Sequence, residues 1–332
     1  MPSPCQKSMN AMIEQNPIVF APYLKSVIWG GNKICDYKGI IQTEPNVGES
    51  WEISAVPGHE SVVAEGTYKG LTLTELIDRF GAELLGEKVM KRYGGKFPLL
   101  IKFIDAADNL SVQVHPDDAL AQKRHNSLGK TEMWYIIRAD KDAKIYAGLR
   151  AALTPDEYVK RVADGTFADT LAVHDSMAGD VFFLPAGRVH AIGAGNLLAE
   201  IQESSDITYR IYDYDRRDAE GNPRELHTES AKDAIDYTVY DEYKNPPVPA
   251  DVADCEIVSC EHFTTDRILL NGELNLRLDH ESFAVVICLE GVVTIKTPAG
   301  ETRFTAGHTV LIPAAVEDVV LTGHGKLLKT QV

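Results

Sequence analysis

Two polar side chains interrupt an apolar run near position 114. Gln113 and His115 alternate with Val112 and Val114, and Pro116 follows. Residues i and i+2 of a β-strand project from the same face, so Gln113 and His115 are expected to leave the strand together. An imidazole nitrogen and an amide oxygen are both ligands for a borderline divalent metal. The pair therefore indicates one part of a metal site.

Two residues further along the chain extend this candidate ligand set. Glu132 lies in the turn Gly129-Lys130-Thr131-Glu132, and His190 follows the turn Pro185-Ala186-Gly187. In a β-barrel we expect Gln113 and His115 on one strand, Glu132 on the next strand and His190 across the interior. Three or four protein ligands that leave a position open are typical of a catalytic site for a metal such as zinc rather than of a closed structural one.

The elements that must position these residues are mostly short strands. Two stretches have helical apolar spacing instead: 72–90, with Thr72 or Thr74 as its N-cap, and 154–170, with Pro155 at its start. Alternating or β-branched runs bounded by turn residues predict strands over 47–56, 61–64, 98–106, 110–114, 133–138, 144–148, 181–184 and 197–201.

A Pro-rich polar stretch at 240–250 predicts a linker between two domains. Regular strand candidates fill the chain beyond it, which favours a second barrel or jelly roll. A short repeat relates the two halves, since Gly179 to Pro185 and Gly307 to Pro313 share the same layout of Gly, five residues and Pro. We predict a mainly β protein with an N-terminal catalytic domain over 1–240, which includes the two helical segments, and a C-terminal barrel over 251–332 without metal ligands.

Charge and composition exclude some classes of partner. The chain has 33 Lys and Arg against 49 Asp and Glu, a formal net charge of −16, and no basic run. Nucleic acid and anionic membranes need clustered cations and are not expected partners, whereas a local pocket can still bind a small anion. The five scattered cysteines, Cys5, Cys35, Cys255, Cys260 and Cys288, are expected to be reduced. No apolar stretch has the length of a membrane span, so a soluble cytoplasmic protein is expected.

Four motifs together resemble the type I mannose-6-phosphate isomerases, which are zinc-dependent enzymes with a cupin fold. They are the run Leu110 to Asp117, the Lys130-x-Glu132 turn, the Pro185-x-Gly-x-x-His190 turn and the stretch from Glu200 to Arg210. The similarity is closest to the short bacterial form and covers nearly the whole chain, including Trp29-Gly30-Gly31 and the segment from Gly48 to Glu52.

The resemblance implies two cupin-like jelly-roll barrels and one zinc ion per chain, held by Gln113, His115, Glu132 and His190. It implies an interconversion of mannose 6-phosphate and fructose 6-phosphate through a cis-enediol. Arg210 corresponds to the family's catalytic arginine and Lys130 to its active-site lysine, while Ser111 matches a serine assigned to the substrate phosphate. The expected substrate-binding residues are therefore Ser111, Lys130 and Arg210.

The sequence does not identify the residue that transfers the proton between C1 and C2. Glu200 or Glu203 is an acid/base candidate if partial burial raises its pKa, and of the two we favour Glu200 as a catalytic residue. The chain has no room for the long helical insertion of larger family members, so contacts from that insertion are not carried over.

Two other classes compete with the isomerase: a non-catalytic sugar-phosphate-binding or regulatory cupin, and an iron-dependent oxygenase. The phosphorylated hexose is the only expected partner, and the oligomeric state does not follow from the sequence.

Overall fold

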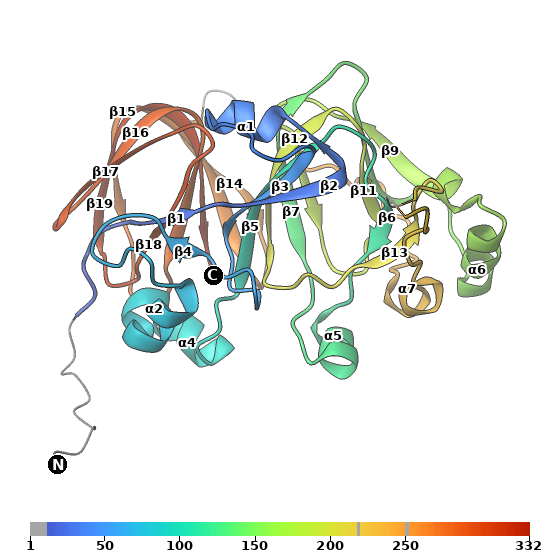
Figure 1. The fold of residues 1–332 in the computed structure, drawn as a ribbon, viewed down its shortest axis with the longest axis horizontal. Coiled ribbons are helices and arrows are strands. Elements are labelled where there is room, and N and C mark those ends of the chain that lie inside the picture. The colour runs from blue at the N-terminus through green and yellow to red at the C-terminus, as the bar shows by residue number, and fades with distance from the viewer. Residues whose placement is uncertain (1–11, 218–219, 250–251) are drawn as a thin grey trace, which may run out of the picture.

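The computed structural model describes residues 12–217, 220–249 and 252–332, and within them antiparallel β-sheets dominate (Figure 1). The prediction of a mainly β protein is confirmed. A six-stranded sheet has the order β10 (Val181–Leu184), β7 (Glu132–Ala139), β12 (Asn196–Glu203), β5 (Leu99–Ala106), β3 (Val47–Ile53) and β2 (Tyr23–Gly31). A five-stranded sheet has the order β13 (Tyr209–Tyr212), β6 (Val112–Val114), β11 (His190–Ile192), β8 (Lys144–Leu149) and β9 (Leu171–Asp175).

The third sheet contains most of the C-terminal strands. Its order is β14 (Asp254–Ser259), β15 (Thr264–Arg277), β19 (Asp318–Gln331), β16 (Ala284–Thr297), β18 (Thr309–Ile312), β1 (Ile18–Ala21) and β4 (Val62–Val63), with β17 (Gly300–Thr305) paired to β16. Two N-terminal strands, β1 and β4, thus extend a C-terminal sheet, and Ile18 pairs with Leu311. The division into domains 1–240 and 251–332 stays a proposal, and these two strands cross it.

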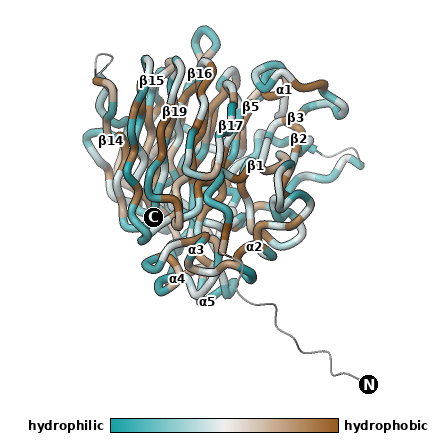
Figure 2. The backbone as a smooth tube through the Cα atoms, turned by 90° about the vertical axis from the view of Figure 1, so that its left-hand side faces the viewer, coloured by the Kyte–Doolittle hydropathy of each residue, from teal (hydrophilic) through white to brown (hydrophobic). Residues whose placement is uncertain are grey.

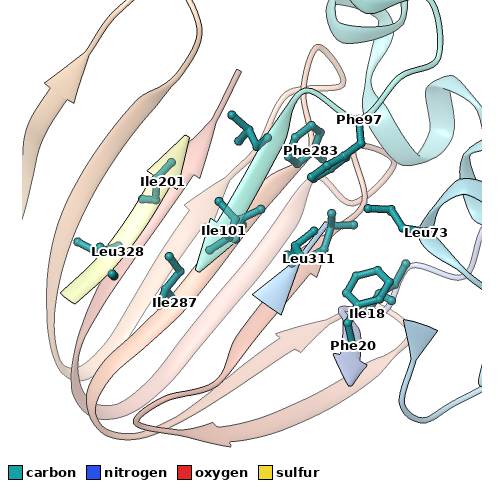
Figure 3. Packing of buried hydrophobic residues seen from close by; sticks show 14 of the residues in the cluster. Ile18, Phe20, Leu73, Phe97, Ile101, Ile201, Phe283, Ile287, Leu311 and Leu328 are labelled. Atoms are coloured by element: carbon teal, nitrogen blue, oxygen red, sulfur yellow. The ribbon is translucent and has the colours of Figure 1, made fainter. Parts of the chain in front are cut away.

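Strand β5 separates two apolar cores because both of its faces are buried. Ile101 and Phe103 belong to the core that lies between the six-stranded and the C-terminal sheets. Figure 3 shows Ile101 and Ile201 of the first half close to Ile287 and Leu328 of the second. The alternate residue Ile104 points the other way, into a core that it shares with Trp134, Ile136, Ile145 and Leu198. That second core lies between the six- and five-stranded sheets, and its polar margin is where the candidate site forms.

The helices are short and lie outside the sheets. α2 (Leu73–Phe80) and α4 (Glu87–Tyr93) lie beside the C-terminal sheet, while α6 (Pro155–Ala163) and α7 (Thr228–Ala234) lie at the opposite end of the molecule (Figure 1). The others are α1 (Lys33–Lys38), α3 (Ala82–Leu85), α5 (Asp118–His125) and a 3₁₀ turn at Phe167–Thr170. Figure 2 shows the apolar colour concentrated along the strands, with teal prominent in the connecting loops. No helix of the described residues is long and apolar enough to cross a membrane.

Both expected helical segments are interrupted by glycine. The segment 72–90 forms three helices, because Gly81 and Gly86 have φ of +51° and +95°, which ends a right-handed helix. Its start matches the sequence, since Thr72 and Glu75 form a reciprocal capping box. The segment 154–170 begins at Pro155 and breaks at Gly165, whose φ is +69°, before the 3₁₀ turn. The apolar periodicity of the sequence predicts where these helices lie. It does not predict that the glycines adopt positive φ angles and interrupt them.

The repeat and the linker both have structural counterparts. Gly179 and Gly307 each have positive φ, and each precedes a four-residue strand, β10 or β18. The described part of the Pro-rich stretch, residues 240–249, has no helix or strand, yet Tyr243 is buried, and its hydroxyl donates to the carbonyl of Leu149 over 2.7 Å. The linker is therefore anchored on the first sheet pair. The four described cysteines are free, and Cys5 lies outside the described residues.

Candidate metal centre and active site

Three of the predicted ligands meet inside the first pair of sheets. The Nε2 atom of His190 lies 3.3 Å from Glu132 Oε1, and Nε2 of His115 lies 3.7 Å from Glu132 Oε2. All three side chains are buried, and their ligand atoms lie within 4.8 Å of one another. Gln113 directly faces His190 across the β6–β11 pair, with its amide nitrogen 3.3 Å from Nε2. Rotating that amide presents its oxygen at the same place.

The expected placement of these ligands needs one correction. His190 is not across the interior from Gln113: β11 pairs with β6, so the two residues are direct neighbours in one sheet. Glu132 lies on β7, the next strand along the chain as predicted, and reaches the cluster from the other sheet. The reason is long-range pairing, since helix α5 and the following loop carry the chain from β6 to the opposite sheet, and the later strand β11 takes the place beside β6.

Both histidines direct an unprotonated Nε2 into the cluster. His115 Nδ1 lies 2.9 Å from the carbonyl of Ile207, and His190 Nδ1 lies 2.8 Å from the carbonyl of Arg188. These carbonyls accept the Nδ1 proton, which leaves the lone pair on Nε2 facing inward, as in metal-binding histidines. Burial, with the nearby Lys130 charge, lowers the pKa of His115 well below its usual value and that of His190 to about 3. Both imidazoles are therefore neutral, which is the ligand form.

One oxygen of the Glu132 carboxylate is buried without a hydrogen bond among the described residues. This oxygen, Oε1, faces His190. The other oxygen, Oε2, accepts from the ammonium group of Lys130, which also lies 3.2 Å from His115 Nε2. A buried carboxylate oxygen needs a proton donor or a cation. The residues therefore fit a bound divalent metal, with two imidazoles, one carboxylate and one amide as its ligands.

A polar cavity of about 420 Å³ opens beside this cluster, a size that suits a small ligand. Gln113 and Lys130 line it at the metal cluster, and Ser111, Arg210 and Glu200 line it as well. The cavity thus brings together every predicted catalytic and substrate-binding residue. Arg210 pairs in register with Gln113 across β13 and β6, and its Nη1 donates to the carbonyl of Glu225 over 2.9 Å.

Glu200 is held between two partners that lie opposite it in the sheet. The register pairs it with Lys102 on β5 and with Trp134 on β7. Lys102 Nζ lies 3.1 Å from Oε1, and the Trp134 indole N–H donates to Oε2 over 2.9 Å. Burial by itself raises the pKa of Glu200, but the charges of Lys102 and Lys130 outweigh burial and hold that pKa below its ordinary value. The raised pKa expected for a general acid is thus not found here.

The other acid/base candidate, Glu203, lies outside the cavity. Its Oε2 accepts from the backbone N–H of Thr131 over 2.7 Å, and its Oε1 lies 3.0 Å from His262 Nδ1. Together with the exposed Asp118, these two residues form a second group of ligand-type atoms within 4.8 Å of one another. Because His262 and Glu203 already form an ion pair, we assign this group a structural role.

Sequence reasoning missed several residues of the cavity. Lys102 had a usable signal, because it is the only charged residue in the apolar run 97–104 that becomes the fully buried β5. It is buried against Glu200, lies 3.9 Å from Glu49 and stacks over the ring of Trp51 at 5.1 Å. Arg224 also lines the cavity, and no spacing in its polar loop distinguishes it from neighbouring arginines.

Comparisons with known proteins agree with this geometry. The family model described as phosphomannose isomerase type I, catalytic domain, matches residues 19–148, and that of the mannose-6-phosphate isomerase cupin domain matches residues 253–332. The cupin prediction for the C-terminal part is thereby confirmed. The chain is 36% identical to the mannose-6-phosphate isomerase ManA of Bacillus subtilis, over 94% of this chain and 98% of that one.

Two further relatives extend the agreement. The mannose-6-phosphate isomerase of Streptococcus mutans is 35% identical, over 91% of this chain and 93% of that one. The crystal structure of the mannose 6-phosphate isomerase from Bacillus subtilis superimposes with a TM-score of 0.87 at 34% identity, covering 96% of this chain and all of that chain. Identity at this level over nearly the full length of both chains shows common descent as well as a common fold. The chain therefore belongs to the family of type I mannose-6-phosphate isomerases.

Proposed function

We propose that this protein interconverts mannose 6-phosphate and fructose 6-phosphate, with one zinc ion per chain. The observation that carries the proposal is the convergence of His115, Glu132 and His190 beside a cavity lined by Lys130 and Arg210. Full-length relatives named mannose-6-phosphate isomerase support the choice of substrate. The cytoplasmic location expected from the sequence is part of the same proposal.

The metal ligands are His115, Glu132 and His190, with the Gln113 amide oxygen as the fourth. Zinc is the proposed ion because neutral imidazole and carboxylate suit it, and the additional Gln113 ligand does not match the facial triad of two histidines and one carboxylate in iron oxygenases. When bound, zinc supplies a Lewis acid that polarises a substrate oxygen. The positive charge of the ion would also take over the neutralisation of Glu132, which frees the Lys130 ammonium to face the substrate.

The reaction moves a proton between C1 and C2 of the sugar, and we propose a cis-enediol as the intermediate. Negative charge develops on the substrate oxygen during this transfer and must be stabilised in a site that excludes water. Arg210 is permanently protonated, and its Nε is buried without a hydrogen-bond partner among the described residues, so it retains a donor for that oxygen. We assign Arg210 this stabilising role.

Lys130 and Glu200 complete the proposed catalytic set. Lys130 lies between the metal ligands and the cavity, where it can bind a substrate oxygen or carry a proton. Glu200 is ionised through its pairing with Lys102, so we assign it the role of a carboxylate base or counter-charge rather than that of an acid. Ser111, which directly precedes β6, is buried, lines the cavity together with Gln113 and is proposed to contact the substrate.

The experiment combines metal analysis with a coupled assay for fructose 6-phosphate. The wild type should contain about one zinc per chain and turn over mannose 6-phosphate. His115→Ala should lose zinc and activity together, whereas Arg210→Ala should keep its zinc and lose turnover. His324→Ala, which changes an exposed histidine of β19, is the matched control and should retain both.

Other outcomes discriminate between the competing functions. Zinc bound without turnover would favour the non-catalytic sugar-phosphate-binding cupin. Iron with oxygen uptake would favour the oxygenase. An Arg210→Ala variant with unchanged kcat would show that the stabilising role belongs to another residue.

A further inference from the structure

A cluster of arginines occupies the part of the cavity beyond Gln113. Ser111, directly before β6, and Gln113 within it line the cavity, and His115, directly after β6, continues the same face. The row from His115 to Ser111 therefore leads away from the metal ligands. Arg210 pairs with Gln113, and Tyr212 pairs with Val112 further along the same two strands. Strand β13 thus runs away from His115, and Asp213 follows directly after Tyr212. The cavity-lining Arg224 contacts Asp213 at this end.

Arg224 is fixed at this end by a two-point contact with Asp213. Its Nε donates to Asp213 Oδ2 over 2.7 Å, and its Nη2 donates to Oδ1. Asp213 is buried and also accepts from Nη2 of Arg216 over 2.7 Å. Holding a guanidinium fork by Nε and one amino group removes the entropy cost of ordering it later. The remaining amino group, Nη1, makes no hydrogen bond among the described residues, and the side chain lines the cavity.

The local charge balance favours an anionic ligand. Arg216 and Arg224 both pair with the buried carboxylate of Asp213, and Arg210 interacts with it electrostatically, whereas the side chain of Glu225 is 83% exposed. Burial, followed by the charge of Arg224, lowers the pKa of Arg210 from its usual value, so the two cations repel each other. Asp206 also lines the cavity, but it is exposed to solvent. In a chain with a net charge of −16, this positive end is a local exception.

We propose that Arg224 binds the phosphate group of the sugar phosphate and is a specificity-determining residue for phosphorylated over free hexose. The inference rests on the proposed function for the identity of the sugar. Planar guanidinium groups match the geometry of phosphate oxygens and form strong charge-assisted bonds with them. The neighbouring Ser111 hydroxyl adds a neutral donor at the same end. Lys130 lies beside His115 and Glu132 at the metal end of the cavity, away from Arg224, which leaves the arginine end for the dianion.

The test compares Arg224→Ala with Arg217→Ala. Both substitutions remove one arginine from the same loop, but Arg217 is exposed and donates to the carbonyl of Gly221 instead of lining the cavity. Titration calorimetry with inorganic phosphate and competitive inhibition by phosphate are measured alongside kcat/KM for mannose 6-phosphate and for free mannose. For Arg224→Ala we expect phosphate affinity and kcat/KM for mannose 6-phosphate to fall about 10- to 100-fold, the range for loss of a charge-assisted contact. The values for free mannose, and all values for Arg217→Ala, should stay within about twofold.

The outcomes separate this inference from the proposed function. Turnover of mannose 6-phosphate with an unchanged KM and phosphate affinity in Arg224→Ala would overturn the inference and leave the function intact. Arg224-dependent phosphate binding without turnover would support the inference while the function fails. An equal loss for mannose and mannose 6-phosphate would assign Arg224 a positioning role through Asp213, which also overturns it. Arg224→Lys guards against a folding defect: it retains a positive charge at the cavity, so it should recover part of the phosphate affinity.

Discussion

The ion pair between Lys102 and Glu200 offers a sharp test of the cavity's electrostatics. The two side chains are 9% and 5% exposed, and their charged atoms lie 3.1 Å apart. Replacing Lys102 with Met keeps the apolar stem and removes the charge, which leaves the Glu200 carboxylate buried without its main cation. Breaking a buried pair from one side typically costs about 3–5 kcal/mol, because the remaining charge stays desolvated. Lys102→Met should therefore destabilise the protein by this amount.

This free energy converts into a measurable shift in melting temperature. With an unfolding entropy of about 2.1 cal/mol/K per residue, a chain of 332 residues has about 0.7 kcal/mol/K, so the expected decrease is about 4–7 °C. Thermal unfolding is followed by tryptophan fluorescence at one fixed zinc concentration, because metal that binds only the native state stabilises it. Lys144→Met is the matched control, since it breaks an exposed pair with Asp175 and should leave the midpoint unchanged.

The double variant Lys102→Met/Glu200→Gln tests whether the lost stability is caused by the unpaired charge of Glu200. Glutamine keeps an acceptor for Trp134 and removes the unpaired charge, so most of the lost stability should return. The pH dependence has a defined sign: losing Lys102 raises the pKa of Glu200, so the deficit of Lys102→Met is largest at neutral pH. It should shrink as the pH falls through that raised pKa and Glu200 becomes protonated. A single variant as stable as Lys144→Met, or a double variant no better than the single one, would refute the electrostatic explanation.

Two further predictions concern other parts of the fold. Burial lowers the pKa of His262, but its close pairing with the Glu203 carboxylate, 3.0 Å away, outweighs burial and raises the pKa above the usual 6.5. The pair therefore stabilises the protein fully below about pH 6.5 and less as the pH rises through the raised pKa, so the melting temperatures of wild type and His262→Gln should converge between pH 6 and 8.5; a constant gap would contradict this assignment. Gly148 has a φ of +80°, and an added Cβ would collide with the ring of Tyr243. Gly148→Ala should cost about 1–3 kcal/mol more in urea unfolding than Gly66→Ala, which has a φ of +77° and open space, and equal costs would show that the linker is not anchored there.

Local sequence patterns determined the chemical types at this site and most of the strands. Strand alternation predicted that Gln113 and His115 share a face, and both lie at the site on or next to β6. The turn motifs around Glu132 and His190 marked the other two ligands, which lie at the starts of β7 and β11. Such predictions succeed because side-chain direction along a strand depends only on a period of two residues.

Only the tertiary structure decided which residues face one another. It placed His190 beside Gln113 and Glu132 opposite them, and it set Lys102 and Trp134 on either side of Glu200. It also joined β1 and β4 to the C-terminal sheet. Strand order and register between distant segments come from the burial of shared cores, which no short sequence window contains. The ionisation of Glu200 depends on that register, because the cation that lowers its pKa arrives from a strand almost one hundred residues earlier.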